Sequence, residues 1–164
     1  MHGVLSGYPL FAALIVVAQS FFGSLPIDGI SCDTAEGAVE HVHVHLQLFE
    51  RGRAVEIPAG IGIPVDRGCL YWLHTHAPDG IIHIESPVRR TFTLGAFFDV
   101  WGMDLNARHA GPLAAVRGRE LRVTVNGVRW NGDSRAIPLR DHEEIVIQAG
   151  PPFARPRPAA WSNL

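Results

Sequence analysis

The chain contains no lysine, and its positive charge is neither abundant nor clustered. The 14 Lys+Arg positions are all arginine and face 16 acidic residues, which leaves a formal net charge of −2 across 164 residues. Proteins that bind the nucleic-acid backbone carry a basic patch or stripe to meet the phosphates. The composition therefore argues against nucleic acid as a partner and indicates that the arginines are solvated charges.

Methionine is scarce, with Met1 and Met103 alone in the chain, so a thioether-rich Cu(I) site is not expected. Several enzyme motifs are missing too: there is no Gly-x-Ser-x-Gly, no phosphate-binding loop and no His-Glu-x-x-His. Residues 74–80 share His-x-His with metallo-β-lactamases, but the aspartate is displaced by one position and Gly80 replaces the last histidine. The cupin pattern, which needs a carboxylate soon after His-x-His and then a later histidine, is also not met in its spacing. No motif therefore names a reaction.

Cysteine is limited to Cys32 and Cys69, and neither lies in a Cys-x-x-Cys redox or zinc motif. In an oxidising compartment the two are expected to form a disulfide. Closing so long a loop stabilises a fold by about 3–4 kcal/mol in the chain-entropy model. The bond would tie the start of the domain to residues 70–72. Two free buried thiols are the alternative.

Charge is absent from residues 3–27, an apolar run long enough to span a bilayer. The same run is typical of the apolar core of a signal peptide, and Ala18-Gln19-Ser20 offers a small-x-small cleavage site. We predict an N-terminal apolar helix over residues 1–27, either a cleaved signal peptide or a retained membrane anchor. A buried core helix is the alternative. Export would place the domain in the periplasm or another extracytoplasmic compartment.

The rest of the chain divides into a β-rich globular domain over residues 28–150 and a proline-rich extended tail over 151–164. Residues 40–50 alternate between polar and apolar side chains, which predicts a strand with its histidines on one face and its valines and leucines on the other. A turn at 51–53 and a short return strand at 54–57 predict a hairpin.

Residues 70–75 and 81–86 are predicted strands on either side of a turn at 77–80. A three-residue loop with a left-handed glycine would place His83 on the face opposite His74 and His76. A four-residue loop would place His74 across from His83 and collect both histidines, His76 and Glu85 on one face. A one-residue slip exchanges these outcomes, and we favour the four-residue loop.

One helix is predicted, at about residues 93–102. Thr93 is a suitable N-cap and Gly102 a suitable C′ residue. Its apolar positions recur with helical spacing and form a core-facing stripe of Leu94, Phe97, Phe98 and Trp101. A strand over 119–126, an Asn126-Gly127 turn, a return strand at 128–130 and a last strand at 144–148 follow.

These elements predict an α+β fold, mainly antiparallel β-sheet with one main helix. The order of hairpin, helix, hairpin and final strand resembles the β-grasp (ubiquitin-like) order, with the strands at 70–86 as an insertion or an added sheet. A resemblance in fold implies nothing about function.

Several longer motifs are distinctive: Asp28-Gly29-Ile30-x-Cys32, His41-x-His43-x-His45-Leu46, Pro58-Ala59-Gly60-Ile61-Gly62-Ile63, Trp72-Leu73-His74-Thr75-His76, Gly80-Ile81-Ile82-His83-Ile84-Glu85-Ser86-Pro87 and Phe92-Thr93-Leu94-Gly95-x-Phe97-Phe98-Asp99-Val100-Trp101-Gly102. On these motifs, residues 28–150 resemble an uncharacterised family of exported or membrane-anchored bacterial proteins. The resemblance implies an extracytoplasmic location and carries no activity.

Histidine is the residue type that points to chemistry. Side chains two positions apart on a strand are about 6.6–6.8 Å apart, so with metal–nitrogen bonds of about 2.0–2.1 Å one ion takes only two histidines from residues 41–45. A second strand must supply the rest of a compact site. The candidate metal ligands are His41, His43, His45, His74, His76, His83 and Glu85.

Imidazole ligands suit transition metals, and copper or zinc is the expected ion. Glu40, Asp99 and Asp104 are candidate hydrogen-bond partners of the ligands. Because bound histidines must be neutral, binding is expected to weaken below about pH 6.5. The alternative is a polar sheet face whose histidines hydrogen-bond one another and Thr75.

Three functions fit these features. The first is a histidine-rich metal-binding protein outside the cytoplasm that handles copper or zinc. The second is a metal-dependent enzyme with an open coordination position and Glu85 or Asp79 as acid or base. The third is a β-grasp-like interaction module, tethered to a membrane complex through residues 3–27.

Overall fold

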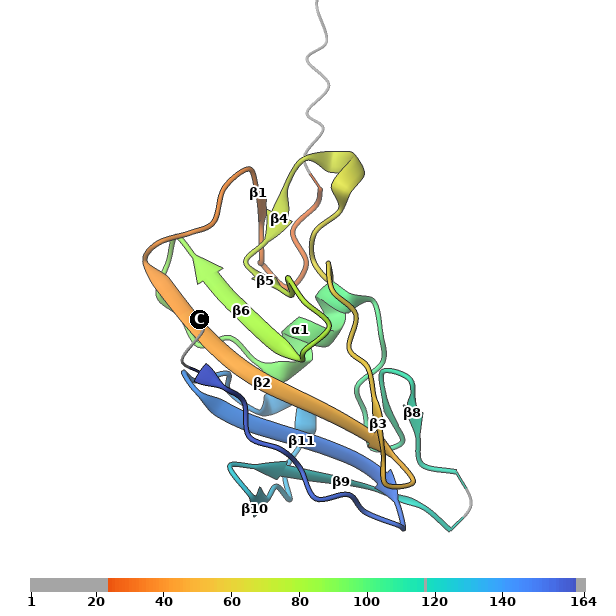
Figure 1. Ribbon diagram of the computed structural model, residues 1–164. Helices are drawn as coiled ribbons and strands as arrows, with labels where there is room; N and C mark the ends of the chain where they lie inside the picture. The colour runs from red at the N-terminus through yellow and green to blue at the C-terminus, as the bar shows by residue number, and fades with distance from the viewer. Residues whose placement is uncertain (1–23, 117, 162–164) are drawn as a thin grey trace, which may run out of the picture.

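The computed structural model describes residues 24–116 and 118–161 (Figure 1). The predicted leader and its apolar helix fall outside these ranges except for residues 24–27. Within the described ranges, no helix is long and apolar enough to cross a membrane. The α+β prediction is confirmed in its general form: a seven-stranded, mostly antiparallel sheet accompanies one α-helix among the described residues.

The sheet is built around β2 (Glu40–Glu50), which pairs in parallel with β11 (Glu143–Gly150). On its other edge β2 pairs antiparallel with β6 (Ile81–Ser86) and then with β3 (Arg53–Val55). The order is β10-β9-β11-β2-β6-β5, with β9 (Glu120–Val125), β10 (Val128–Arg129) and β5 (Leu73–His74).

The remaining elements are short and lie outside this sheet. They are β1 (Cys32–Asp33), β4 (Leu70–Tyr71), β7 (His109–Ala110), β8 (Leu113–Ala114) and the 3-10 turns η1 (Val65–Arg67) and η2 (Ser134–Ala136).

One face of the sheet packs against α1 (Leu94–Trp101) and forms the core (Figure 1). The side chains that meet there are fully buried: Val44, Leu46, Leu48, Ile82, Ile84, Phe97, Phe98, Ile145 and Ile147. Full burial of such a side chain is worth about 1.5–3 kcal/mol. Because strand residues alternate between faces, this packing turns the histidines of β2 and β6 to the outer face.

The helix forms where its capping residues predict. The Thr93 hydroxyl accepts a hydrogen bond from the Ala96 amide, and Gly102 takes the left-handed conformation with φ +71°. The Asn126-Gly127 turn is also confirmed: both residues have positive φ, and Val125 pairs with Val128. These local signals were sufficient because each acts within a few residues.

The turn at 77–80 adopts the four-residue register, since His74 pairs with His83 and Leu73 with Ile84. Gly80 has φ +82°, and a Cβ there would lie 2.3 Å from the Leu46 carbonyl oxygen, so glycine is required.

The strands at 70–86 were predicted to form an insertion or an added sheet, and the added sheet is wrong. Both β5 and β6 belong to the main sheet, and only β4 lies outside it, paired with β1. The reason is that β3 covers only residues 48–50 of β2. The edge of β2 that β3 leaves uncovered is taken by β6 over residues 40–45.

The predicted disulfide is present between Cys32 and Cys69, with their Cα atoms 5.4 Å apart. It joins β1 to the start of β4, and the indole Nε1–H of Trp72 donates to Asp33 at 2.6 Å. The segment after β1 is therefore held beside the strand that leads to His74.

The tail runs back across β11 and β2 on the outer face, opposite α1 (Figure 1). The amides of Ala154 and Ala159 donate to the side chains of Gln148 and Glu144, both at 2.7 Å. The tail takes no regular strand, but it is fixed to the same face that carries the histidines.

Candidate metal centre

A row of three imidazoles crosses the outer face of neighbouring strands β5, β6 and β2. His74 is the cross-strand partner of His83, and His83 is the partner of His43. Because neighbouring strands are about 4.8 Å apart, side chains in one row touch. The ring centroids of His43 and His83 are 4.7 Å apart, and the rings of His74 and His83 stack at 5.6 Å.

Two further histidines and a glutamate complete the cluster. Glu85 is the cross-strand partner of His41, next to the row of three. The His76 ring lies 4.7 Å from the His74 ring and 4.6 Å from the His83 ring. Six of the seven predicted ligands are therefore brought together on one face.

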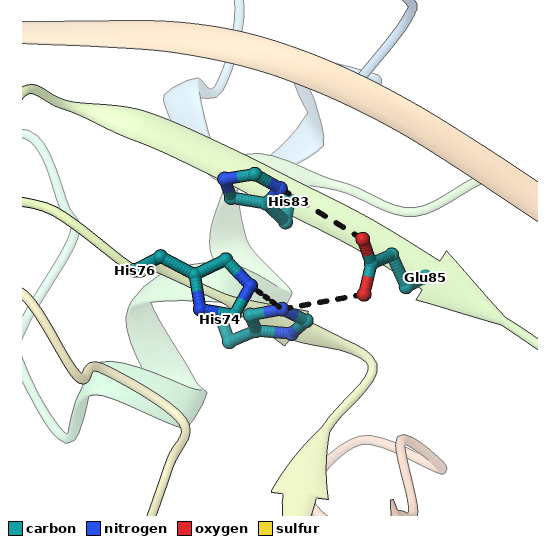
Figure 2. A group of neighbouring side chains, drawn as sticks. All are labelled: His74, His76, His83 and Glu85. Atoms are coloured by element: carbon teal, nitrogen blue, oxygen red, sulfur yellow. Dashed lines mark hydrogen bonds and ion pairs between the residues drawn. The ribbon is translucent and has the colours of Figure 1, made fainter. Parts of the chain in front are cut away.

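The cluster contains two groups of donor atoms that share Glu85. In each group the donor atoms lie within 4.8 Å of one another. The first group is His74, His76, His83 and Glu85 (Figure 2), and the second is His41, His43 and Glu85. Donors this close need only small movements to bind one ion.

The hydrogen bonding of His74 fixes which of its nitrogens faces the cluster. Nδ1 lies 2.9 Å from the carbonyl oxygen of Tyr71. A carbonyl oxygen can only accept, so Nδ1 carries the proton and Nε2 of the neutral ring presents a lone pair. The Nε2–H of His76 can then donate to it at 3.1 Å. A backbone acceptor on the far nitrogen is the usual support of a metal-bound histidine.

Glu85 is buried in the centre of the cluster with one oxygen unsatisfied. Its residue is 5% exposed, and within residues 24–116 and 118–161 its Oε2 makes no hydrogen bond. Oε2 lies 3.5 Å from Nε2 of His74 (Figure 2). Burial, followed by the nearby carboxylate of Glu36, raises the pKa of Glu85 above its ordinary range.

The histidines of the row are poor proton acceptors. Burial, followed by the adjacent His43, lowers the pKa of His83 to about 4. Burial also lowers the pKa of His74 and, together with its neighbour His41, that of His43. These rings therefore remain neutral at a pH where an exposed histidine is protonated, and neutral imidazole is the form that binds metals.

Glu36 is a residue of the cluster that sequence reasoning missed. Its Oε1 lies 3.6 Å from Nε2 of His76. It comes from an irregular segment with no pattern of its own, four residues after Cys32. The one sequence signal was the predicted disulfide, which indicated that this segment lies near the strand of His74.

His45 stands apart from both groups. Its Nδ1 lies 2.7 Å from Oε2 of Glu144, its neighbour on the parallel strand β11, and its ring is 6.4 Å from that of Trp161. His45 instead lines a cavity of about 720 Å³ between the tail and β3. The six clustered donors are not among the residues that line this cavity.

Asp99, one of the three predicted hydrogen-bond partners of the ligands, instead forms an ion pair with Arg135. For Glu40 and Asp104 that role stays a prediction. Asp79, the alternative to Glu85 as acid or base, accepts a hydrogen bond from the Ile81 amide at 3.0 Å within the turn. Thr75, the proposed partner in a polar face without metal, donates to the Pro58 carbonyl oxygen at 2.8 Å. Its hydroxyl therefore serves the loop before β4 rather than the histidines.

No protein-family model, curated protein or solved structure matches this chain.

Proposed function

We propose that this protein binds a transition metal ion through His74, His76, His83 and Glu85. One observation carries the proposal: the lone pair on Nε2 of His74 faces the unsatisfied Oε2 of Glu85 at 3.5 Å. While Glu85 is ionised both atoms are acceptors, so they repel unless a proton or a metal ion lies between them. Burial opposes protonation of His74 and favours a proton on Glu85. We propose that a metal ion takes the place of that proton, because the neighbouring imidazoles supply further ligands.

The spacing supports the same conclusion. Two ligands bound tetrahedrally at about 2.0–2.1 Å are about 3.3–3.4 Å apart. The His74–Glu85 pair at 3.5 Å and the His74–His76 pair at 3.1 Å already bracket that value. Three imidazoles and one carboxylate suit Zn²⁺ or Cu²⁺. Four protein ligands close a tetrahedral site, as is typical of ions that are held rather than used in catalysis.

Copper or zinc handling outside the cytoplasm is the biological setting that fits. The disulfide between Cys32 and Cys69 indicates an oxidising compartment. The uncharged run over residues 3–27 supports export, with cleavage or membrane anchoring. The motif resemblance to exported or membrane-anchored bacterial proteins points to the same location.

We also place the domain among β-grasp-like folds. The order β6-β2-β11-β9-β10 supports this placement, because two central strands run parallel and the helix falls between β6 and β9. This placement concerns architecture alone and adds nothing to the metal proposal.

Metal analysis of the full protein, purified without a His-tag, tests the function. His76→Ala is the informative variant because the His76 side chain is 46% exposed and its loss leaves the core intact. We expect the Kd for Zn²⁺ to rise at least about tenfold. Loss of a residue that only supports a ligand already weakens metal affinity by about 10–100-fold, and His76 is itself a proposed ligand. His109→Ala, an exposed histidine far along the chain, is the matched control. Equal zinc affinity in both variants would exclude this cluster as the site.

A further inference from the structure

We infer that the cluster is a two-metal centre, in which His41 and His43 hold a second ion and Glu85 bridges both ions. This inference rests on the proposed function, because the first ion is the one bound by His74, His76 and His83.

The two oxygens of Glu85 face different histidines. Oε2 is directed to Nε2 of His74 at 3.5 Å, whereas Oε1 lies 3.3 Å from Nε2 of His41. Figure 2 shows Oε2 at His74 and Oε1 on the side of His83, whose Nδ1 lies 3.8 Å away. Oε1 is therefore closer to His41 of the second group than to His83 of the first. A carboxylate that serves one ion would aim one oxygen or both at it. Oxygens that serve separate nitrogen groups form a bridge.

The two histidines of the second group come from one strand, β2. His41 and His43 are two positions apart on the same face of β2, and their ring centroids are 4.9 Å apart. The backbone of His43 is fixed by two hydrogen bonds, from its amide to Asp141 at 3.2 Å and to its carbonyl from His142 at 2.8 Å. The backbone that carries His43 is therefore held on both its amide and its carbonyl side.

The separation of the groups argues against a single ion that takes all six donors. His41 and His43 share with the first group only Glu85 as a donor within 4.8 Å of all the others. A bridging carboxylate holds two ions about 3.5–4 Å apart, which is common in two-metal sites. Glu36 beside His76 and Asp141 beside His43 add negative charge at each end of such a pair.

The two ions would differ in access. The first has four protein ligands. The second has three, and the His41 side chain is 59% exposed, so water or another ligand completes its coordination. Closed sites retain their metal, whereas sites with an open position exchange ligands. The second ion is therefore the exchangeable one.

Metal counting on the full, untagged protein tests the inference. The protein is stripped with a chelator, reloaded with Zn²⁺ or Cu²⁺, dialysed and analysed for metal per chain. We expect two ions in the wild type and one in His41→Ala and in His43→Ala, with His109→Ala unchanged. Because His41→Ala alters an exposed side chain, misfolding would not explain the loss of one metal ion in this variant.

Electron paramagnetic resonance of the Cu²⁺-loaded protein tests the bridge. Coupled ions should give less than the full signal of two isolated Cu²⁺ ions, and His41→Ala should restore the full signal of one. No ion in the wild type would overturn the proposed function itself. One ion in the wild type, retained in His41→Ala, would overturn only the second site. Two uncoupled ions would overturn the shared carboxylate.

Discussion

The substitution Glu85→Gln is expected to stabilise the metal-free protein and to weaken its metal binding. In the metal-free state Glu85 is 5% exposed and faces the lone pair of His74 with an oxygen that receives no hydrogen bond within the described ranges. An amide of the same shape removes the buried charge. Its NH₂ group replaces the unsatisfied oxygen, so a donor rather than a second acceptor faces Nε2 of His74, and its oxygen can accept from His41.

The size of the gain follows from the cost of an unsatisfied group. A buried polar atom without a partner costs about 1–3 kcal/mol, and more when it is charged. The free energy of unfolding should therefore rise by about 1–3 kcal/mol. For a domain of this size, each kcal/mol raises the unfolding midpoint by about 3–4 °C, so Tm should rise by about 3–12 °C. Metal affinity should fall because a neutral amide is a weaker ligand than a carboxylate.

The gain should depend on pH with a definite sign. Because the pKa of Glu85 is raised in the folded protein, the ionised carboxylate is the destabilised form. Below its ordinary value of 4.5 the carboxyl is protonated in both the folded and unfolded states. The advantage of Glu85→Gln should therefore be small near pH 4 and grow as the pH rises through the folded pKa.

Urea unfolding in excess chelator measures this effect, with the four tryptophans as the fluorescence probe. Glu56→Gln, at an exposed position, is the matched control and should stay within about 0.5 kcal/mol of the wild type. A lower free energy of unfolding for Glu85→Gln at pH 8 would refute the reasoning. That result would mean that Glu85 stabilises the metal-free fold as an acceptor for its histidines.

Three other predictions concern His83, the disulfide and the N-cap of the helix. The pKa of His83 is lowered from 6.5 to about 4, and its side chain is 13% exposed. Its contribution to the free energy of unfolding should be fully present above pH 6.5 and be lost, by about 3 kcal/mol, as the pH falls from 6.5 through 4. Urea unfolding in a Glu85→Gln background measures this loss. Replacing Cys32 and Cys69 by serine should cost about 3–4 kcal/mol and also weaken zinc affinity in a titration, because Glu36 loses its position; unchanged stability would contradict the entropic estimate. Thr93→Ala should cost about 1 kcal/mol in thermal unfolding with zinc affinity unchanged.

Features set by neighbouring residues could be predicted from the sequence. The helix follows from Thr93 and Gly102, and the register of His74 against His83 follows from the length of the turn between them. The hairpin of β2 with β3 was also predictable from the turn between them, but the pairing of β2 with β6 was not, because no local turn joins these two strands. The parallel contact of β2 with β11 joins segments about a hundred residues apart, and no local signal specifies it.

The sequence could predict which candidate ligands share a face of the sheet, but not which of them meet in one site. Alternation placed His41, His43 and His45 together, but Glu144 on β11 bonds His45, and that contact depends on the parallel pairing. The tautomer of His74 depends on the Tyr71 carbonyl, which only the folded backbone positions. Glu36 lies beside His76 because the disulfide holds its segment next to the strand of His74, and no sequence motif predicts that position.

The cluster works against the metal-free fold, and that cost is itself an argument for a bound cation. A buried carboxylate with a raised pKa is held by the fold in an unfavourable ionised state, and the imidazoles beside it have lowered pKa values, so they do not take up a proton to neutralise it. An apolar residue at any of these positions would remove the cost. A bound metal ion turns this free-energy cost into a stabilising contribution, because neutral imidazoles and an ionised carboxylate are the forms that it binds. A site filled at a hundred times its Kd adds about 2.7 kcal/mol of stability by mass action, which is comparable to the estimated cost of leaving Glu85 unsatisfied.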